Sequence, residues 1–381
     1  MVGLEPRREL FVGLMSGTSL DGTDGVAVEF STTGATPPLR ILAHARRSFP
    51  AALRAELAAL NQSGADEIHR AAIAANALAR EAAAVVDAVL RGAVIDRAEV
   101  AAIGAHGQTV RHRPGASGGY TVQLNAPALL AELTGIDVVA DFRSRDVASG
   151  GQGAPLVPAF HRAMFGKPDA AVAVLNLGGI ANLTMLGPGG IVAGFDTGPA
   201  NVLLDLWCER STGQTFDTAG AWGSRGAVDP RLLDALLAEP YFAAVPPKST
   251  GRDLFNAAWL DARLDRADAC ARLRPEDIQS TLAELTARVV AEAFSAHGNG
   301  AAELIVCGGG ARNADLEARL GRHLAPVAVV PSDLRGLPAD QVEATAFAWL
   351  ARSFLGRMPG NVPAVTGAAG ARILGALYPA R

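Results

Sequence analysis

The chain has 381 residues, and a length of this order predicts two domains of roughly 150–200 residues that need no disulfides to fold. Hydrophobic residues make up 49% of it and charged residues 19%, a composition that argues against a disordered chain. The formal net charge is −4 and no basic run is longer than a few Arg, which disfavours a nucleic-acid partner.

The cysteines and the opening residues bear on the compartment. Cys208, Cys270 and Cys307 are far apart and show neither CxxC nor zinc-finger spacing, which favours reducing surroundings. No stretch reaches the ~18 apolar residues of a membrane helix, and the opening MVGLEPRREL lacks a hydrophobic signal segment. We therefore expect a soluble cytoplasmic protein with no membrane partner.

The first half of the chain predicts a hairpin, helices and buried strands. Two apolar runs flank the turn SGTSLDG, a pattern typical of a β-hairpin. A Walker P-loop instead needs GxxxxGK(S/T) between a strand and a helix, and that pattern is absent. In chain order, the predictions are strands at 10–15 and 25–30, helices at 50–61 and 66–91, a buried strand running into a polar loop at 100–112, a second buried strand with a charged, then glycine-rich connection at 135–156, and a helix from near Pro155.

The second half begins with a similar hairpin, now with a Gly-Gly turn, at 171–186. A strand then leads into Asp196 and an amphipathic helix, with Pro199 suited to the first helical turn. The remaining predictions are a helix at 275–297, a buried strand ending in three glycines at 303–310, helices from Asn313 and from Ala339, and a short Gly/Ala-rich terminal helix. Two glycine-turn hairpins in corresponding halves predict a duplicated α/β fold with a cleft between its domains.

Both hairpin turns are candidate phosphate loops. In GTSLDGTD, residues 17–24, glycines allow close approach of the backbone, and successive N–H groups of a tight turn can cradle an anion. Its Asp residues would repel a naked phosphate, so they suit this role only near Mg²⁺ or its water shell. The alternative is an ordinary Asp-Gly hairpin turn. Gly178-Gly179, with Asn182 nearby, offers a similar turn, and two such loops facing each other would clamp a triphosphate.

Asp196 and the glycines after residue 307 are the next candidates. Asp196 ends a strand just before a helix, so it either caps that helix or serves as a general base. Gly308, Gly309 and Gly310 would let a flat ligand such as adenine approach bare backbone, although GxGxxG is absent. Cys307 is best explained as a small buried hydrophobic residue.

Charged and polar residues elsewhere leave alternatives open. In DFRSRD, Arg143 and Arg145 could receive a carboxylate, or could pair internally with Asp141 and Asp146. Lys248 fits either a phosphate contact or plain surface charge. His106 and Gln108 lie between small residues in GAHGQT, and Glu343 by default is a solvated helix residue. HExxH, paired Cys/His and EF-hand patterns are all absent, so we predict no metal site built by the protein alone.

In combination these motifs closely resemble the anhydro-N-acetylmuramic acid kinase family, from Gly13 to the terminal LGALYPA. The likeness is carried by GLMSGTSLDGTD, GAHGQTVRH, ADFRSRDVASGGQGAPLVPAFH, LNLGGIANLT, GFDTGPANVLLD, PKSTGR and CGGGARN. The family belongs to the sugar kinase, Hsp70 and actin-like ATPases. The resemblance implies two duplicated actin-like (ribonuclease H-like) domains around an interdomain cleft, with expected bounds of 1–140 plus 365–381 for the first domain and 141–364 for the second.

The resemblance also implies the reaction. Water opens the 1,6-anhydro bridge of 1,6-anhydro-N-acetylmuramic acid at C1 while the freed O6 receives the γ-phosphoryl group of ATP. The products are N-acetylmuramic acid 6-phosphate and ADP, in peptidoglycan recycling. ATP and Mg²⁺ are the implied cofactors, and a homodimer is the implied assembly.

Site residues follow by motif position. Asp196 matches the family's water-activating aspartate. The implied ATP contacts are Gly17, Thr18, Ser19, Leu20, Asp21, Gly22, Thr23, Asp24, Gly178, Gly179, Asn182, Gly308, Gly309 and Gly310, with Mg²⁺ near Asp21 or Asp24. The implied substrate contacts are His106, Gln108, Arg143, Arg145 and Glu343. We hypothesise that Arg143 or Arg145 reads the lactyl carboxylate.

Three alternatives compete with this interpretation. A related kinase of an intact hexose or amino sugar would phosphorylate without ring opening. A nucleotide-dependent binding module would need an added peptide-binding domain or a polymer surface. A sugar-responsive repressor would need a basic helix-turn-helix extension, and none precedes Leu10.

Overall fold

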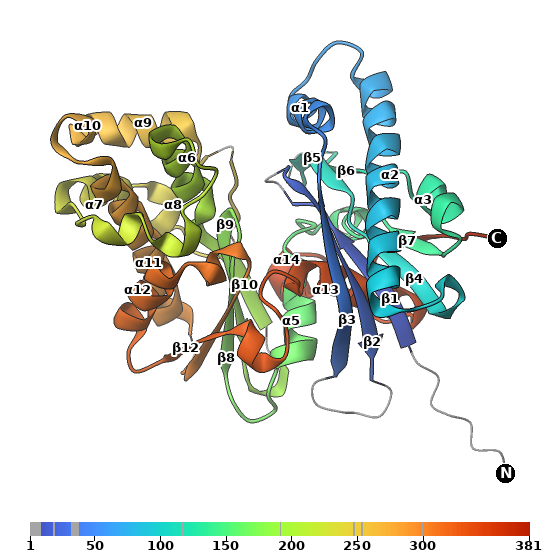
Figure 1. Ribbon diagram of the computed structural model, residues 1–381. Coiled ribbons are helices and arrows are strands. Elements are labelled where there is room, and N and C mark those ends of the chain that lie inside the picture. The colour runs from blue at the N-terminus through green and yellow to red at the C-terminus, as the bar shows by residue number, and fades with distance from the viewer. Residues whose placement is uncertain are drawn as a thin grey trace. The chain divides into compact units, whose positions relative to one another are not determined.

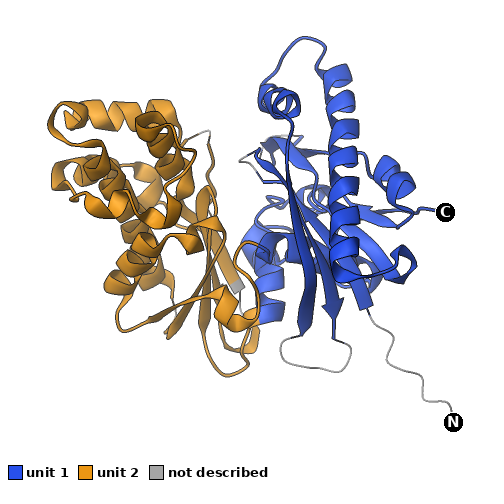
Figure 2. Cartoon of the chain, in the orientation of Figure 1, with its two compact units in different colours: residues 1–164, 341–381 blue, residues 165–340 orange. Residues whose placement is uncertain are grey.

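The computed structural model describes residues 9–17, 20–31, 38–115, 118–190, 192–246, 248–252, 254–298 and 300–381. The chain forms two compact units (Figure 2). The first contains residues 1–164 and 341–381, and the second contains residues 165–340. Each unit is built on its own mixed sheet.

The first unit has a sheet in the order β13-β7-β4-β1-β2-β3. The strands β1, β2 and β3 form an antiparallel meander, while β4 and β7 continue the sheet parallel to β1 (Figure 1). A separate hairpin joins β5 and β6. The strands are β1 Glu9–Met15, β2 Gly22–Phe30, β3 Leu39–Ser48, β4 Val100–Ala105, β5 Gln108–Arg113, β6 Tyr120–Leu124, β7 Val138–Ala140 and β13 Ala376–Tyr378.

Helices cover both faces of this sheet. Gly25 of β2 pairs with Leu14 of β1 and lies under the α2 residue Val85. Gly13, the neighbour of Leu14 in β1, lies under Ala344 of α13. Because neighbouring residues of a strand point to opposite faces, α2 and α13 pack on opposite sides. The helices of this unit are α1 Ala51–Ala59, α2 Glu67–Ala93, α3 Pro127–Thr134, α4 Ser144–Ala148, α5 Val157–Phe165, α13 Val342–Leu355 and α14 Pro363–Thr366.

Two glycines allow α13 to lie directly on the sheet. A Cβ added to Gly13 would lie 1.9 Å from the Ala344 carbonyl oxygen, and one on Gly104 would lie 2.0 Å from that of Phe347. Gly13 and Gly104 are register partners in β1 and β4, so together they form a flat seat for the helix backbone. Glycine is therefore required here for close packing and not for a turn.

The second unit repeats this arrangement. Its sheet has the order β10-β9-β8-β11-β12, with β8 to β10 antiparallel and β11 and β12 parallel to β8. The strands are β8 Val172–Leu177, β9 Ile180–Leu186, β10 Val192–Pro199, β11 Glu303–Cys307 and β12 Ala328–Pro331. The helices are α6 Asn201–Thr212, α7 Pro230–Leu237, α8 Pro240–Ala243, α9 Ala257–Arg266, α10 Ala269–Arg272, α11 Pro275–His297 and α12 Ala314–Leu324.

The duplication predicted from the two hairpins is confirmed. When only the strands of each main sheet are counted in chain order, both sheets run 3-2-1-4-5 with the same strand directions, and β13 adds an edge to the first. The predicted α/β fold of two duplicated units is therefore correct. The hairpins at 10–30 and 171–186 and the helix at 275–297 are also where the sequence placed them.

Several local predictions differ from the structure. The units change over after residues 164 and 340, not 140 and 364, because α13 packs on β1 and β4 and Phe160 of α5 contacts Trp349 of α13. At 100–112, where we predicted a buried strand running into a polar loop, the residues from Gln108 onward form the strand β5. Pro199 ends β10 instead of entering α6. At the carboxyl terminus Gly367, in the left-handed region, ends the short helix α14, and residues 376–378 then pair with β7 as β13 where a terminal helix was predicted.

Candidate active site

Asp196 lies near the end of β10, beside a register shift between Asp196 and Gly198. Asn182, its partner on β9, donates an Nδ2–H to Oδ1 at 2.9 Å, and the Thr250 backbone N–H donates to Oδ2 at 3.0 Å. Each carboxylate oxygen therefore has one donor here and keeps a lone pair for another. Because the side chain is only half-buried, that further donor can be water. Burial raises the pKa of Asp196, and the two hydrogen bonds oppose that rise.

The alternative role for Asp196, capping α6, is wrong. The N-cap of α6 is Ala200, and the first N–H groups donate to the Gly178-Gly179 turn. Asn201 N–H reaches the Gly178 oxygen at 3.1 Å, and the N–H groups of Ala200 and Val202 both reach that of Gly179 at 3.0 Å. Since the turn already caps the helix, the Asp196 carboxylate is not needed as a helix cap.

This capping also bears on the second predicted phosphate loop. The carbonyl groups of Gly178 and Gly179 face α6, and both residues are half-buried. The Asn182 side chain, predicted to contact phosphate, instead holds Asp196. The structure thus brings Asn182 together with the candidate base.

Packing explains part of the glycine run after Cys307, which is buried as predicted. A Cβ on Gly308 would lie 2.3 Å from Asn176 Oδ1, and one on Gly310 would lie 2.6 Å from Leu177 Cβ. Gly308 also has a φ of 81°. These two glycines therefore let the turn cross the end of β8, and Gly309 is the exposed member of the run.

The first predicted phosphate loop joins β1 to β2 in the first unit. Thr18 and Ser19 lie outside the described residues. Leu20 has a φ of 59°, and Gly22 approaches the Arg47 carbonyl so closely that a Cβ would lie 2.3 Å from its oxygen. Thr23 is buried in β2.

The two acids of this loop contact polar side chains of β3. Arg46 Nη2 donates to Asp21 Oδ2 at 2.6 Å, and His44 Nε2 lies 3.1 Å from Asp24 Oδ1. The Asp21–Arg46 pair is about half exposed, so solvent screens it. Both carboxylates offer the oxygen ligands that Mg²⁺ prefers, and a metal bound there would compete with Arg46.

Buried polar residues fix the start of this loop. His106 Nδ1 donates to the Ser16 carbonyl oxygen at 3.1 Å, and Gln108 Nε2 donates to that of Gly17 at 3.1 Å. Ser16 Oγ donates to Gln108 Oε1. Gln108 is fully buried and His106 is 5% exposed, so the structure places these predicted substrate contacts beneath the loop.

His106 also connects the loop to Arg143. Arg143 donates to His106 Nε2 from Nε at 3.1 Å and from Nη2 at 3.0 Å, and Nη1 donates to the Gly153 carbonyl oxygen at 2.7 Å. Burial and this guanidinium lower the pKa of His106 to about 3, so the ring is neutral and can accept. Burial lowers the pKa of Arg143 to about 10, opposed by the charges of Glu343 and Asp146.

The internal ion-pair cluster proposed for DFRSRD is not what holds this segment. Asp146 is fully buried and accepts from Gly153 N–H, Asn361 Nδ2 and Thr366 Oγ1 at 2.7–2.8 Å. Asp141 accepts from Ser144. Arg145 is exposed, whereas Arg143 and Glu343 are half-buried.

Thr250, Tyr241 and Ser16 are contacts of the site that the sequence did not predict as such. The Tyr241 hydroxyl donates to the Asp196 carbonyl oxygen at 2.8 Å. Residues 241–250 lack the periodicity of a strand or an amphipathic helix, so nothing in their pattern indicates a partner 45 or more residues away.

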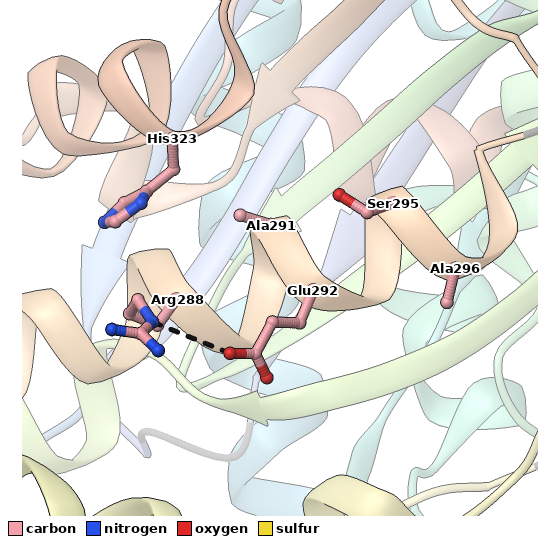
Figure 3. Close-up of a pocket in the computed structure, with 6 residues that line it drawn as sticks. All are labelled: Arg288, Ala291, Glu292, Ser295, Ala296 and His323. Carbon is pink, nitrogen blue, oxygen red and sulfur yellow. Dashed lines mark ion pairs between the residues drawn. The ribbon is translucent and has the colours of Figure 1, made fainter.

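Other features of the described part of the chain lie apart from these residues. A surface pocket in the second unit is lined by Arg288, Ala291, Glu292, Ser295 and Ala296 of α11 and by His323 of α12 (Figure 3). It contains none of the predicted site residues. Among the described residues, no group of three or more His, Cys, Asp or Glu side chains is arranged to hold a metal. No helix within those residues is long and apolar enough to cross a membrane.

Comparison with known proteins identifies strong similarity over the whole chain. The family model described as Anhydro-N-acetylmuramic acid kinase matches residues 9–380. A protein of that name from Bordetella petrii is 62% identical, over 97% of this chain and 96% of its own length. Another from Albidiferax ferrireducens is 56% identical, over 98% of this chain and all of its own length.

Solved structures show a more distant likeness. A ROK family glucokinase from Streptomyces griseus, in complex with glucose and AMPPNP, is 17% identical with a TM-score of 0.40, over 90% of this chain and 99% of its own. Component A of the (R)-2-hydroxyglutaryl-CoA dehydratase from Acidaminococcus fermentans is 13% identical with a TM-score of 0.45, over 89% and 96% of the two chains. Likeness at this level is no argument for a particular substrate.

Proposed function

Because the chain belongs to the anhydro-N-acetylmuramic acid kinase family and is a kinase, we propose that it couples hydrolysis to phosphorylation on one sugar. Its substrate is 1,6-anhydro-N-acetylmuramic acid from cell-wall recycling in the cytoplasm. The products are N-acetylmuramic acid 6-phosphate and ADP.

In the proposed reaction, hydrolysis of the anhydro bridge and phosphorylation of O6 occur together. Asp196 accepts a proton from water while the water oxygen bonds to C1 of the sugar. The C1–O6 bond breaks with its electron pair on O6, which bonds to the γ-phosphorus of ATP. The bond from that phosphorus to ADP breaks. A carboxylate that activates water is the base half of an inverting glycosidase mechanism, and phosphorylation of O6 takes the place of the acid.

The setting of Asp196 is the observation that carries this proposal. Its carboxylate is half-buried, is fixed by donors on both oxygens, and is not used as a helix cap. Burial raises the pKa of Asp196, which makes the carboxylate a stronger base than an exposed one. A positioned base of this kind contributes about 10²–10⁴-fold to a rate.

ATP contacts fall, in our proposal, on Gly17–Asp24 in the first unit and on Gly178, Gly179 and Gly309 in the second. Phosphoryl transfer depends mainly on positioning and on neutralisation of charge. Mg²⁺ bound with ATP would supply part of that neutralisation, with Asp21 or Asp24 as the carboxylate nearest to it. Those two side chains fit the metal by their oxygen ligands and by their exposure.

Substrate contacts fall on Arg143, Arg145 and Glu343. Arg143 donates from Nε and Nη2 to His106 and from Nη1 to the Gly153 carbonyl oxygen, so two of its five N–H donors remain for a carboxylate such as that of the lactyl group. Arg145 is exposed and competes for the same role. His106 and Gln108 act by holding Ser16 and Gly17 and, through His106, Arg143.

Mass spectrometry of the products tests the reaction. The protein is incubated with the anhydro sugar, Mg-ATP and ¹⁸O-water. We expect a phosphorylated product with one ¹⁸O at C1, lost in Asp196→Asn. A phosphorylated product that keeps its anhydro ring would instead support the kinase of an intact sugar. Light scattering in solution tests the homodimer that the resemblance implies.

A further inference from the structure

Three polar groups of Asp196 are held by one segment of the second unit. The Asp196 N–H donates to the Lys248 carbonyl oxygen at 3.2 Å, its carbonyl accepts from the Tyr241 hydroxyl at 2.8 Å, and Oδ2 accepts from the Thr250 N–H at 3.0 Å. We name Tyr241, Phe242, Lys248 and Thr250 the Asp196 clasp. The orientation of the carboxylate therefore depends on how this clasp is fixed.

The Lys248 ammonium joins the two ends of the Asp196 clasp. Nζ donates to the carbonyl oxygens of Tyr241 at 3.2 Å and Phe242 at 3.0 Å, and it lies 4.9 Å from the centre of the Tyr241 ring. An ammonium has three N–H donors. Two go to carbonyl groups at the end of α8 and the remaining side meets an aromatic face, a favourable cation–π position.

The rings of the clasp are anchored in the hydrophobic core. Phe242 stacks on Phe255 at 5.7 Å between centroids, and Tyr241 meets the same ring edge-on at 5.9 Å. Gly198 of β10 makes room for this stack, because a Cβ there would lie 2.8 Å from Phe242 Cε1. One side of the clasp is thus rigid, and Lys248 ties the segment that carries Thr250 to that side.

From this arrangement we propose that Lys248 is a positioning residue for Asp196 and not a phosphate ligand. The inference rests on the proposed function, in which Asp196 is the base. Removal of the ammonium frees the segment that carries Thr250 and weakens the hydrogen bond to Oδ2. That bond favours the charged carboxylate, so its loss moves the acidic limb of the pH–rate profile to higher pH.

The titration expected in the acidic range belongs to Asp196 itself. Burial and the charge of Asp196 raise the pKa of Tyr241, so its hydroxyl stays protonated and donates. Burial lowers the pKa of Lys248, but as an ammonium with two carbonyl acceptors it stays charged in that range. Asn182, on the other carboxylate oxygen, does not titrate.

The test compares variants with the anhydro sugar and Mg-ATP as substrates. Lys248→Met keeps the aliphatic stem and removes the charge. We expect kcat to fall about tenfold, a fraction of the 10²–10⁴ that a general base contributes, with the KM for ATP unchanged and the acidic limb shifted upward. Tyr241→Phe keeps the ring under Lys248 and removes the hydroxyl, and we expect the same direction of change in kcat with no change in the KM for ATP.

Lys167→Met is the matched control. Lys167 is the other lysine of the chain, is about half exposed and pairs with Glu303 at 3.2 Å. We expect wild-type kinetics from it. If Lys248→Met fails to fold by circular dichroism, Lys248→Gln, whose amide keeps donors near these carbonyl groups without the charge, decides the question by the same readouts.

The outcomes separate the two proposals. A Lys248→Met enzyme with a raised KM for ATP and an unmoved pH profile would overturn the positioning role, while an inactive Asp196→Asn would leave the base in place. Activity that survives in Asp196→Asn would instead overturn the proposed function. If Lys248→Met folds and Tyr241→Phe has wild-type kcat, the hydrogen bond from the Tyr241 hydroxyl does not help to position Asp196.

Discussion

Replacement of Asn182 by Ala tests whether Asp196 titrates as the base. The substitution removes the Nδ2–H that lies 2.9 Å from Asp196 Oδ1 and leaves the Thr250 donor in place. A hydrogen bond to a charged group contributes about 1.5–3 kcal/mol, which corresponds to about 1–2 pKa units. Because the carboxylate is half-exposed and water can replace part of the lost bond, we take the lower end, about one unit.

The direction in which the pKa of Asp196 moves depends on which protonation state the Asn182 hydrogen bond favours. Asn182 donates to the charged carboxylate and so lowers the pKa of Asp196 against the rise caused by burial. Without it the pKa rises further, and a larger fraction of the base is protonated at acidic pH. The acidic limb of kcat/KM, which reports the free enzyme, should move up by about one unit.

Steady-state kinetics across pH provide the measurement, with Asn313→Ala as the control. Asn313 caps α12 in the same unit through its Oδ1, 3.0 Å from Leu316 N–H. Its loss should cost about 1 kcal/mol of stability without moving the limb. An Asn182→Ala enzyme that is folded and keeps the wild-type limb would refute the reasoning, since Asp196 would then not set that limb.

Three further predictions concern packing, acid stability and substrate recognition. Gly13→Ala should destabilise the protein by about 1–3 kcal/mol or more in chemical unfolding, because its Cβ would lie 1.9 Å from the Ala344 oxygen. Gly321→Ala in α12, where the added Cβ meets nothing within 4 Å, should instead raise the stability by about 0.5–1 kcal/mol. Equal effects of the two substitutions would contradict the close packing of α13 on Gly13. Burial lowers the pKa of His106 and His161 from 6.5 to about 3, so the folded chain binds fewer protons than the unfolded one and loses stability as pH falls from 6.5 towards 3; His106→Gln should lose less over that range, and a loss equal to that of the wild type would count against a neutral buried ring. Arg145→Ala should leave the melting temperature unchanged, whereas Arg143→Ala should lower it through the lost bonds to His106 and Gly153; the variant that raises the KM for the anhydro sugar identifies the residue that reads the carboxylate, and no change in either would rule out both.

The sequence predicts the fold well where local pattern and tertiary packing agree. Both glycine-turn hairpins and the helix at 275–297 formed as expected, because alternation and helical spacing are read from neighbouring residues. Predictions were wrong where a distant partner decides the structure. The carboxyl terminus became β13 because β7 offered an open edge, a fact that the Gly/Ala-rich pattern of the terminus does not contain.

The candidate site divides in the same way. Residue type and position identified Asp196, since a carboxylate at the end of a strand of an α/β unit is a candidate base. Its partners were not predictable, because Tyr241 and Thr250 reach it from 45 and 54 residues away in the chain. Excluding the cap also needed the structure, in which Gly178 and Gly179 cap α6, and the role of Asp196 as the base stays a proposal.

Glycines and buried polar residues show why a motif is not a contact. In the run after Cys307, Gly308 and Gly310 are required by Asn176 and Leu177 of β8, which leaves Gly309 as the exposed position where a ligand can approach the backbone. In GAHGQT, His106 and Gln108 are buried and bonded to Ser16 and Gly17. In these motifs the buried residues hold their neighbours in place, and our proposal assigns the ligand contacts to the more exposed ones.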